Sequence, residues 1–422
     1  MRLTIIAIGS RGDVQPYVAL GVGLQQAGHQ VCVATHSAFE ELVRSRGLRF
    51  FSLGPDPRQV GDTKEGITWL NSGKNQIQFI RYFIRVMQPW LEETMEEAWN
   101  ASQGAEAIIY SRLGVIGYHV AERLGIPSFW APLQPLSRTR SMSCDGVELP
   151  AWLPFQGQFN ELSFFIVEQV FWQPFREQIN KWRQAHGMAP MPWLGPYRQM
   201  ADKHQPILYG FSPSVVPKPP DWGSWVHVNG YWFLDRLPDW QPPARLVDFI
   251  TSGPPPIAIG FGSMKGHDSE PLLDIIKQTL SHTGQRAVLL TGWSGIRDLD
   301  GSDDIYAIEE VPHDWLFPLT SVTVHHGGAG TTAAGLRAGI PSIIVPYFAD
   351  QGSWGQRVVK LGVGPNPVPR KLLTAENLAA AIEIATQDTA MRARAAVMAR
   401  RIQSEDGVGK AVAAFHQHMN ML

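Results

Sequence analysis

Short runs of apolar residues alternate along the chain with segments in which apolar residues recur every three or four positions. The first apolar run covers residues 2–8, a helical pattern follows from Asp13 to about Ala27, and a second apolar run covers residues 30–35. Apolar runs of this length indicate buried strands, and the longer period indicates helices. Strand, helix and strand in immediate succession form a βαβ unit, which implies a parallel sheet with a right-handed crossover.

The same alternation starts again in the second half of the chain. Two proline-rich segments, 212–222 and 239–243, separate the halves and are typical of semi-rigid connectors. We therefore predict an α/β protein of two domains, residues 1–237 and 238–400. Residues 207–211 are expected to form the last strand of the first domain and residues 50–73 a loop, and a further strand is predicted at 226–232, between the two proline-rich segments. Strands of the second domain are predicted at residues 256–262, 286–290, 305–311, 322–324 and 342–345.

Composition agrees with a two-domain globular protein. The chain has 422 residues, more than one domain usually contains, with 44% hydrophobic and 18% charged residues. A net charge of −2 gives no reason to expect a nucleic-acid partner. Cys32 and Cys144 are too few for a disulfide framework or a thiolate metal site. Because no stretch reaches about 18 apolar residues, we expect no transmembrane helix and a cytoplasmic protein.

One glycine-rich stretch carries the candidate chemistry. Strand-like residues 322–324 meet a run of glycines, and helix-forming residues begin at Thr331. Glycines allow close backbone approach, and the first N–H groups of a helix lack internal partners, so this loop predicts an anion site. Asp350 and Gln351, after the next strand, could bond several hydroxyls. A nucleotide-sugar is indicated.

A dinucleotide is the alternative ligand of this loop. Residues 328–333 also fit the G-x-G-x-x-G/A pattern, with Asp350 near the position of the ribose carboxylate, which would make the protein an oxidoreductase. The pair His325-His326 and the residue Gln351 have no role in that pattern. They therefore favour the nucleotide-sugar.

The joint pattern resembles the donor signature of family 1 GT-B glycosyltransferases. It is closest to the sterol-glucosyltransferase and glycopeptide-antibiotic branch, which carries His-His-Gly-Gly-Ala-Gly-Thr, as at residues 325–331, and Asp-Gln, as at 350–351. The resemblance implies two Rossmann-like domains facing across a cleft, with a helix in residues 401–422 that packs back on the first domain. It implies diphosphate binding by Ser263, His326, Gly328, Ala329, Gly330 and Thr331, sugar binding by Asp350 and Gln351, and nucleobase binding by Val311 and its possible neighbour Trp293.

A second motif of the same branch lies after the first strand. Residues 9–16 match its Gly-Ser-Arg-Gly-Asp-x-x-Pro pattern. The resemblance makes Asp13 the general base that accepts the proton of the acceptor hydroxyl during attack on the anomeric carbon. The residues alone equally allow Asp13 to be a helix cap. Ser10 and Ser111, near strand ends, are expected beside the acceptor, although Ser111 could instead cap the next helix.

Aromatic residues crowd the segment 151–193. Some of them, including Phe165 and Trp172, follow a helical stripe, with Arg176, Lys181 and Arg183 nearby. One interpretation is a helix packed on the domain core. The other is the lining of a large apolar acceptor pocket, or a surface that contacts a membrane in which a lipid acceptor resides.

These expectations combine into one function. The chain is expected to be an inverting glycosyltransferase that needs neither a metal nor another cofactor. It is expected to move a sugar to a hydroxyl of a hydrophobic acceptor such as a sterol or lipid. The expected donor is UDP-glucose. Transfer of a UDP- or dTDP-sugar to a polyketide, peptide or carotenoid is the alternative. A further alternative is a protein that binds the nucleotide-sugar as a partner of another protein without catalysing a transfer.

Overall fold

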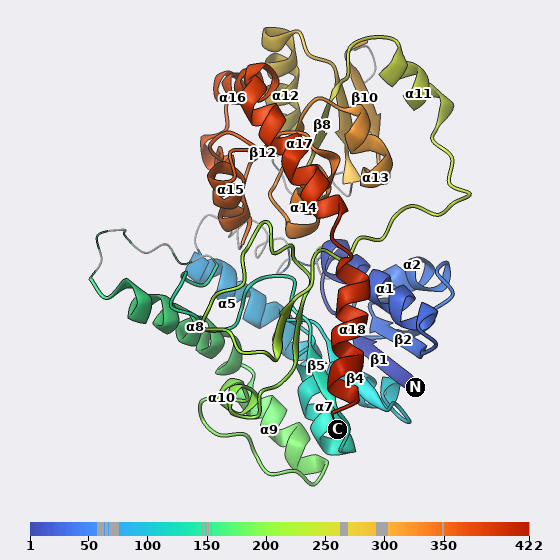
Figure 1. Cartoon of the computed structure of the whole chain (residues 1–422), viewed down its shortest axis with the longest axis vertical. Coiled ribbons are helices and arrows are strands. Elements are labelled where there is room, and N and C mark those ends of the chain that lie inside the picture. The colour runs from blue at the N-terminus through green and yellow to red at the C-terminus, as the bar shows by residue number, and fades with distance from the viewer. Residues whose placement is uncertain are drawn as a thin grey trace. The chain divides into compact units, whose positions relative to one another are not determined.

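The computed structural model describes residues 1–56, 63, 66, 76–145, 147, 150, 152, 154–261, 269–292, 303–347 and 350–421. The chain divides into two compact units (Figure 1). Unit 1 comprises Met1–Thr63, Arg81–Leu234 and Glu405–Leu422, and unit 2 comprises Lys64–Ile80 and Asp235–Ser404. Each unit is built around its own parallel β-sheet.

The sheet of unit 1 has seven strands in the order β3-β2-β1-β4-β5-β6-β7, and every neighbouring pair is parallel. The predicted loop 50–73 was wrong at its start, because β3 pairs with β2 there. The strand expected at 207–211 is β6, and the strand predicted at 226–232 is β7, which pairs with β6 and is therefore the last strand of this sheet. The strands are β1 (Arg2–Ile6), β2 (Gln30–Thr35), β3 (Arg49–Ser52), β4 (Ala107–Tyr110), β5 (Ser128–Trp130), β6 (Ile207–Tyr209) and β7 (Val226–Val228).

Helices cover the sheet of unit 1 because their apolar stripes bury against it. The last helix of the chain, α18, packs beside α1 (Figure 1) and contributes Val412 and Phe415 to the same core as Tyr17 and Leu24 of α1. The helices are α1 (Arg11–Gln26), α2 (Glu40–Arg44), α5 (Gln76–Met87), α6 (Leu91–Ala101), α7 (Ile116–Leu124), α8 (Gln156–Trp172), α9 (Arg176–Ala185), α10 (Tyr197–Asp202) and α18 (Gly407–Met419).

The sheet of unit 2 has five parallel strands in the order β10-β9-β8-β11-β12. Its central strands are buried on both faces, and two separate apolar clusters lie around it. The strands are β8 (Ile257–Gly260), β9 (Ala287–Leu290), β10 (Ile305–Ile308), β11 (Thr323–His325) and β12 (Ser342–Ile344). The helices are α11 (Ala244–Thr251), α12 (Ser269–Thr283), α13 (His313–Leu316), α14 (Ala329–Ala338), α15 (Gln351–Lys360), α16 (Ala375–Gln387) and α17 (Thr389–Gln403).

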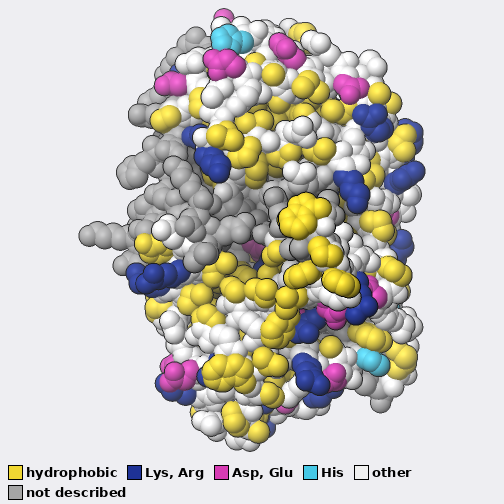
Figure 2. Space-filling model, turned by 90° about the vertical axis from the view of Figure 1, so that its left-hand side faces the viewer, with side chains coloured by type: hydrophobic (Ala, Val, Ile, Leu, Met, Phe, Trp, Pro, Cys, Tyr) yellow, Lys and Arg dark blue, Asp and Glu magenta, His cyan; other side chains and the backbone are white. Residues whose placement is uncertain are grey.

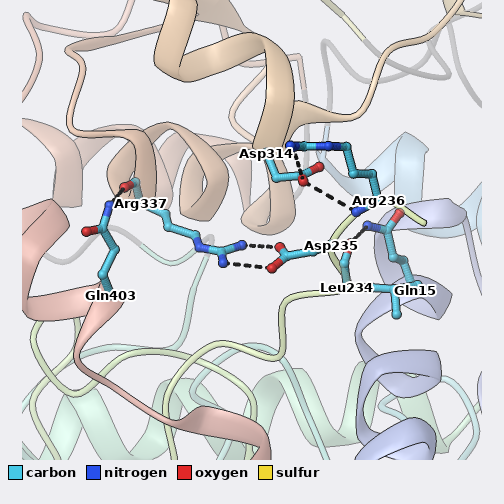
Figure 3. Close-up of polar contacts among 7 residues, drawn as sticks. All are labelled: Gln15, Leu234, Asp235, Arg236, Asp314, Arg337 and Gln403. Atoms are coloured by element: carbon cyan, nitrogen blue, oxygen red, sulfur yellow. Dashed lines mark hydrogen bonds and ion pairs between the residues drawn. The ribbon is translucent and has the colours of Figure 1, made fainter. Parts of the chain in front are cut away.

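Polar contacts within unit 2 hold the start and the end of its main segment, Asp235–Ser404 (Figure 3). Both carboxylate oxygens of Asp235 accept hydrogen bonds from Arg337, in the last turn of α14. Arg236 donates to Asp314 at 2.8 Å. Gln403, at the end of α17, donates to the carbonyl oxygen of Arg337 at 2.8 Å. The helix α14 therefore anchors both segments.

No helix among the described residues is long and apolar enough to cross a membrane.

Candidate functional site

The glycine-rich loop of unit 2 connects β11 to α14. Gly327 has φ +90°, and a Cβ there would lie 2.6 Å from a side-chain carbon of Ile344 and 2.9 Å from the carbonyl oxygen of Gln351. A Cβ on Gly328 would lie 2.5 Å from Nε2 of His326. Side chains at these positions would displace their neighbours, so the loop requires glycine.

The first turn of α14 follows this loop at the carboxyl edge of the sheet. Its N-cap is Gly328, which has no side chain to bond the N–H groups of Ala329, Gly330 and Thr331. A Cβ added to Gly330 would meet nothing within 4 Å among the described residues. The carbonyl of Gly328 is occupied, since it accepts from the backbone and hydroxyl of Thr332, both at 2.9 Å. The turn therefore presents backbone donors and space to an anion.

The two histidines before the glycines have different surroundings. His325 is buried, and its Nδ1 accepts a hydrogen bond from the backbone N–H of Gly327 at 3.1 Å. This bond shapes the loop. Burial lowers the pKa of His326 to about 4, and the charge of Asp350 opposes that shift. At neutral pH His326 is therefore an uncharged hydrogen-bonding group rather than a cation.

Asp350 and Gln351 begin α15, immediately beside the glycine loop. Asp350 is the N-cap of α15, and its Oδ2 accepts from Nε1 of the buried Trp354 at 2.9 Å. Oε1 of Gln351 accepts from the backbone N–H of Tyr347 at 2.7 Å. These bonds fix both side chains. The fold thus brings together His326, the first turn of α14 and the Asp-Gln pair, which are separated by about twenty residues in the sequence.

Asp13 lies in the first turn of α1, at the carboxyl edge of the sheet of unit 1. The helix begins at Arg11 with Ser10 as N-cap, so Asp13 is its third residue rather than the cap itself. Its Oδ2 accepts from the backbone N–H and from the hydroxyl of Ser10, both at 2.9 Å. Gly9, with φ +136°, makes room for it, because a Cβ there would lie 2.6 Å from Oδ2. Asp13 thus both stabilises the helix start and is held in one position.

A cavity lies within unit 1, with an empty volume of about 1080 Å³ that includes open solvent at its mouth. Ile8 lines the cavity and belongs to the segment between β1 and α1 that also carries Ser10. Neither Ser10 nor Asp13 is itself among the residues that line the cavity. Most of its lining is apolar and comes from α5, α6, α7, α8 and the start of α9.

The acceptor residues expected from the sequence lie at different places around this cavity. Trp172 lines it, and its Nε1 donates to the carbonyl of Trp193 at 2.8 Å. Phe165 is not among the lining residues and lies beneath the guanidinium of Arg138, 5.2 Å from it, while its neighbour Phe164 faces the cavity. Ser111 is not among the lining residues either, and its hydroxyl accepts from the backbone N–H groups of Ile8 at 3.3 Å and of Gly114 at 3.1 Å. It does not cap α7, whose N-cap is Val115.

Of the other residues predicted to bind the nucleotide, only one lies within the described part of the chain. Ser263 and Trp293 lie outside the described residues. The side chain of Val311 is buried in an apolar cluster of unit 2 that includes Leu316 of α13, so only its backbone is left for a nucleobase. Sequence reasoning missed the cavity residues of α5, α6 and α7, such as Met87 and His119. Their helical periodicity indicates an apolar face but does not distinguish a packed core from the wall of a cavity.

Two protein-family models match the chain. Residues 3–143 match the "Glycosyltransferase family 28 N-terminal domain", and residues 294–413 match the "Erythromycin biosynthesis protein CIII-like, C-terminal domain". The calicheamicin glycosyltransferase CalG4 aligns over 100% of this chain and 99% of its own, with a TM-score of 0.72 and 18% identity. A glycosyltransferase of kitacinnamycin has the same TM-score over 99% of this chain and 98% of its own, at 17% identity. Fold and site therefore define a protein of the GT-B glycosyltransferase class, as predicted.

Relatives in sequence show to which family within this class the chain belongs. Sterol 3-beta-glucosyltransferase UGT80B1 of Arabidopsis thaliana is 37% identical over 99% of this chain and 68% of its own length. The chain belongs to the family of these sterol 3-beta-glucosyltransferases. A sterol 3-beta-glucosyltransferase of Cryptococcus neoformans is 36% identical over 99% of this chain, which spans only 27% of that protein. The chain thus corresponds to about two thirds of the plant relative and about a quarter of the fungal one.

Proposed function

We propose that the chain transfers glucose from UDP-glucose to the hydroxyl of a sterol with inversion at the anomeric carbon. The observation that carries this proposal is the coexistence of the Asp13 motif and the complete donor signature in a chain 37% identical to a sterol 3-beta-glucosyltransferase over nearly its whole length. A protein that only bound the nucleotide-sugar would need the second element but not the first.

Unit 2 would hold the donor. The N–H groups at the start of α14 and the neutral imidazole of His326 would donate hydrogen bonds to the diphosphate, while Asp350 and Gln351 would bond the sugar hydroxyls. As the bond between the anomeric carbon and the diphosphate oxygen breaks, that oxygen keeps the electron pair. Fixed backbone donors stabilise this growing charge without having to reorganise.

Unit 1 would supply the acceptor and the base. The acceptor hydroxyl attacks the anomeric carbon, a new C–O bond forms, and the proton passes to the carboxylate of Asp13. The bonds from Ser10 to Oδ2 set the orientation of that carboxylate. The apolar body of a sterol would occupy the cavity, which is lined by residues of α7 and α8 and by Ile8, in the segment between β1 and α1.

Catalysis is proposed to be independent of a divalent metal, because the helix start of α14 can perform the electrostatic task of a cation at the diphosphate. The sequence Asp298-Leu299-Asp300 contains two carboxylates of the kind that bind such ions, and it lies outside the described residues. Turnover should be equal in EDTA and in Mg²⁺. Loss of turnover in EDTA, restored by Mg²⁺, would contradict metal independence.

The outer face of α8 is proposed to rest on a membrane that contains the acceptor. Phe159, Leu162 and Ile166 lie on one exposed stripe of α8, continued by Phe155 at its N-cap, which is 73% exposed. Figure 2 shows hydrophobic side chains gathered on this face, with Lys and Arg among them. The opposite face of α8, with Phe164 and Phe171, lines the cavity. One helix would therefore contact the lipid and the bound acceptor at once.

Liposome flotation tests the membrane contact. Leu162→Glu together with Ile166→Glu should abolish binding to phosphatidylcholine vesicles that contain about 20% anionic lipid. The matched control is Ile384→Glu, which changes a similarly exposed isoleucine on α16 of unit 2. Equal binding by all variants would remove the stripe from the membrane contact.

The reaction is tested by release of UDP from UDP-glucose by the purified chain, with and without a sterol, and by isolation of the glycoside. Release that requires the sterol supports the transfer. If UDP raises the melting temperature but no sterol stimulates release, unit 2 is a donor site for a different reaction, and other sugars and aglycones are to be tried.

A further inference from the structure

Two of the polar residues that line the cavity of unit 1 have a buried nitrogen that the proposed transfer does not use. His119 of α7 and Trp130 of β5 both line it, and both are at least nine-tenths buried. Nε2 of His119 and Nε1 of Trp130 have no hydrogen-bond partner among the described residues. Thr94 and Glu168 line the same cavity, but Thr94 bonds the carbonyl of Trp90 and Glu168 bonds Arg138.

The proton of His119 is placed by its neighbours. Arg183, itself buried, has Nη1 3.1 Å from Nδ1 of His119, and a guanidinium can only donate, so Nδ1 accepts. Arg183 is held by Glu122 at 2.7 Å and by the carbonyl of Ala189 at 2.8 Å. Burial, together with the charge of Arg183, lowers the pKa of His119 to about 3, so the ring is neutral. Its single N–H is therefore at Nε2, directed away from Arg183.

Trp130 also has a fixed donor, because an indole Nε1 always carries its proton. Both residues line a cavity whose other walls are largely apolar, and each has a buried N–H group that bonds none of the described residues. A buried donor without a partner costs free energy, and a ligand oxygen that accepted from it would recover that cost. An acceptor made only of hydrocarbon beyond its reactive hydroxyl would leave both donors unsatisfied.

We propose that the acceptor of this chain carries a second oxygen, a hydroxyl or carbonyl remote from the hydroxyl that is glycosylated, and that His119 and Trp130 recognise it. The inference rests on the proposed function in taking an apolar alcohol as the ligand of the cavity. It restricts that ligand to oxygenated sterols or similarly sized alcohols with two oxygen functions. Arg183 acts as a positioning residue, because it determines which nitrogen of His119 carries the proton.

Direct binding tests the inference without requiring turnover. The quenching of intrinsic tryptophan fluorescence would be titrated with cholesterol, which has one oxygen, and with 25-hydroxycholesterol and dehydroepiandrosterone, which have a second oxygen at different distances from the first. Wild type should bind at least one of the oxygenated sterols about tenfold more tightly than cholesterol, the ratio expected from one buried hydrogen bond. His119→Phe or Trp130→Phe should reduce that ratio to near one.

Two further variants separate recognition from structure. His119→Gln keeps an N–H donor near the position of Nε2 and should restore part of the preference. Trp182→Phe is the matched control, because the indole nitrogen of Trp182 is likewise buried without a partner among the described residues, but Trp182 does not line the cavity. It should leave the preference unchanged. Thermal melting of each variant checks that it is folded.

The outcomes distinguish the two proposals. Binding of all three sterols with equal affinity, or a preference that survives both His119→Phe and Trp130→Phe, overturns the second-oxygen inference and leaves the proposed sterol transfer intact. If none of the three sterols binds to wild type, the sterol proposal fails, and the inference fails with it.

Discussion

The helix starts of α1 and α14 both lie at the carboxyl edge of a parallel sheet, yet their backbone N–H groups are satisfied in different ways. Each follows a central parallel strand and opens at the carboxyl edge of its sheet. The start of α1 carries its own carboxylate, Asp13, bonded to Ser10. The start of α14 has a glycine N-cap and no acidic residue in its first turn. A helix start that contains an anion stabilises itself, whereas one without an anion is suited to bind one from a ligand.

At both helix starts a glycine leaves room for a neighbouring side chain, but the side chain differs. At α1, Gly9 leaves room for the carboxylate of Asp13, and at α14, Gly328 leaves room for the imidazole of His326. The comparison therefore predicts that the two helix starts have different functions. Changes at the first helix start should affect chemistry, and changes at the second should affect binding of the nucleotide.

Asp13→Asn should have the largest effect. The amide keeps the size of the side chain but cannot accept the proton of the acceptor hydroxyl, so kcat should fall by about 10²–10⁴-fold. Affinity for UDP, measured by calorimetry, should stay within about twofold of wild type because unit 2 is unchanged. A variant with normal kcat would reduce Asp13 to a helix-stabilising residue and remove the contrast between the two helix starts.

Acid should destabilise the second helix start through His326. Its folded pKa of about 4 lies below the ordinary value of 6.5, so the unfolded chain takes up a proton that the folded chain excludes. The stabilisation from keeping this ring neutral is complete above pH 6.5 and is lost as the pH falls toward 4, by about 3 kcal/mol in total.

Denaturant unfolding of wild type and His326→Gln between pH 7 and 4 measures this loss. The variant should show the weaker pH dependence, since Gln does not titrate. Because the charge of a bound diphosphate favours the protonated ring, the increase in melting temperature caused by UDP should grow at lower pH in wild type only. Parallel curves for the two proteins would contradict the assignment.

Alanine at Gly328 and at Gly330 forms a matched pair within one helix turn. A Cβ at Gly328 would collide with His326, so Gly328→Ala should lower stability by about 1–3 kcal/mol and weaken UDP binding. A Cβ at Gly330 meets open space, and alanine favours helix, so Gly330→Ala should raise stability by about 0.5–1 kcal/mol. If UDP occupies that space, this variant should still bind UDP less tightly. Unchanged UDP binding would place the diphosphate elsewhere.

Arg337→Ala should have the smallest effect. Arg337 bonds Asp235 at the far end of α14, but both side chains are partly exposed, and such pairs contribute about 0–1 kcal/mol. Unfolding by urea should detect at most this change, and UDP affinity should be unaltered. A loss of UDP affinity would show that the two ends of α14 are coupled, so that the comparison of helix starts alone is too simple.

Local patterns in the sequence were sufficient for much of the fold. The apolar runs and helical periods predicted two parallel-sheet domains, because buried parallel strands need continuous apolar residues and helices need a period near 3.6. They failed at β3, and at β7 (Val226–Val228) they predicted the strand but made it too long. Arg49–Ser52 is only partly buried and lies at an edge, so it lacks the apolar density of a central strand.

The sequence by itself determined the two glycine motifs and the residues grouped around them, because the roles of Gly9, Asp13 and Gly328 depend on neighbours a few positions away. Only the tertiary structure decided which aromatic side chains surround a cavity. Phe164 and Phe165 are adjacent and chemically identical, yet only Phe164 lines it. The tautomer of His119 likewise depends on Arg183, sixty-four residues later in the chain. Such properties arise from packing between distant segments, which local periodicity does not encode.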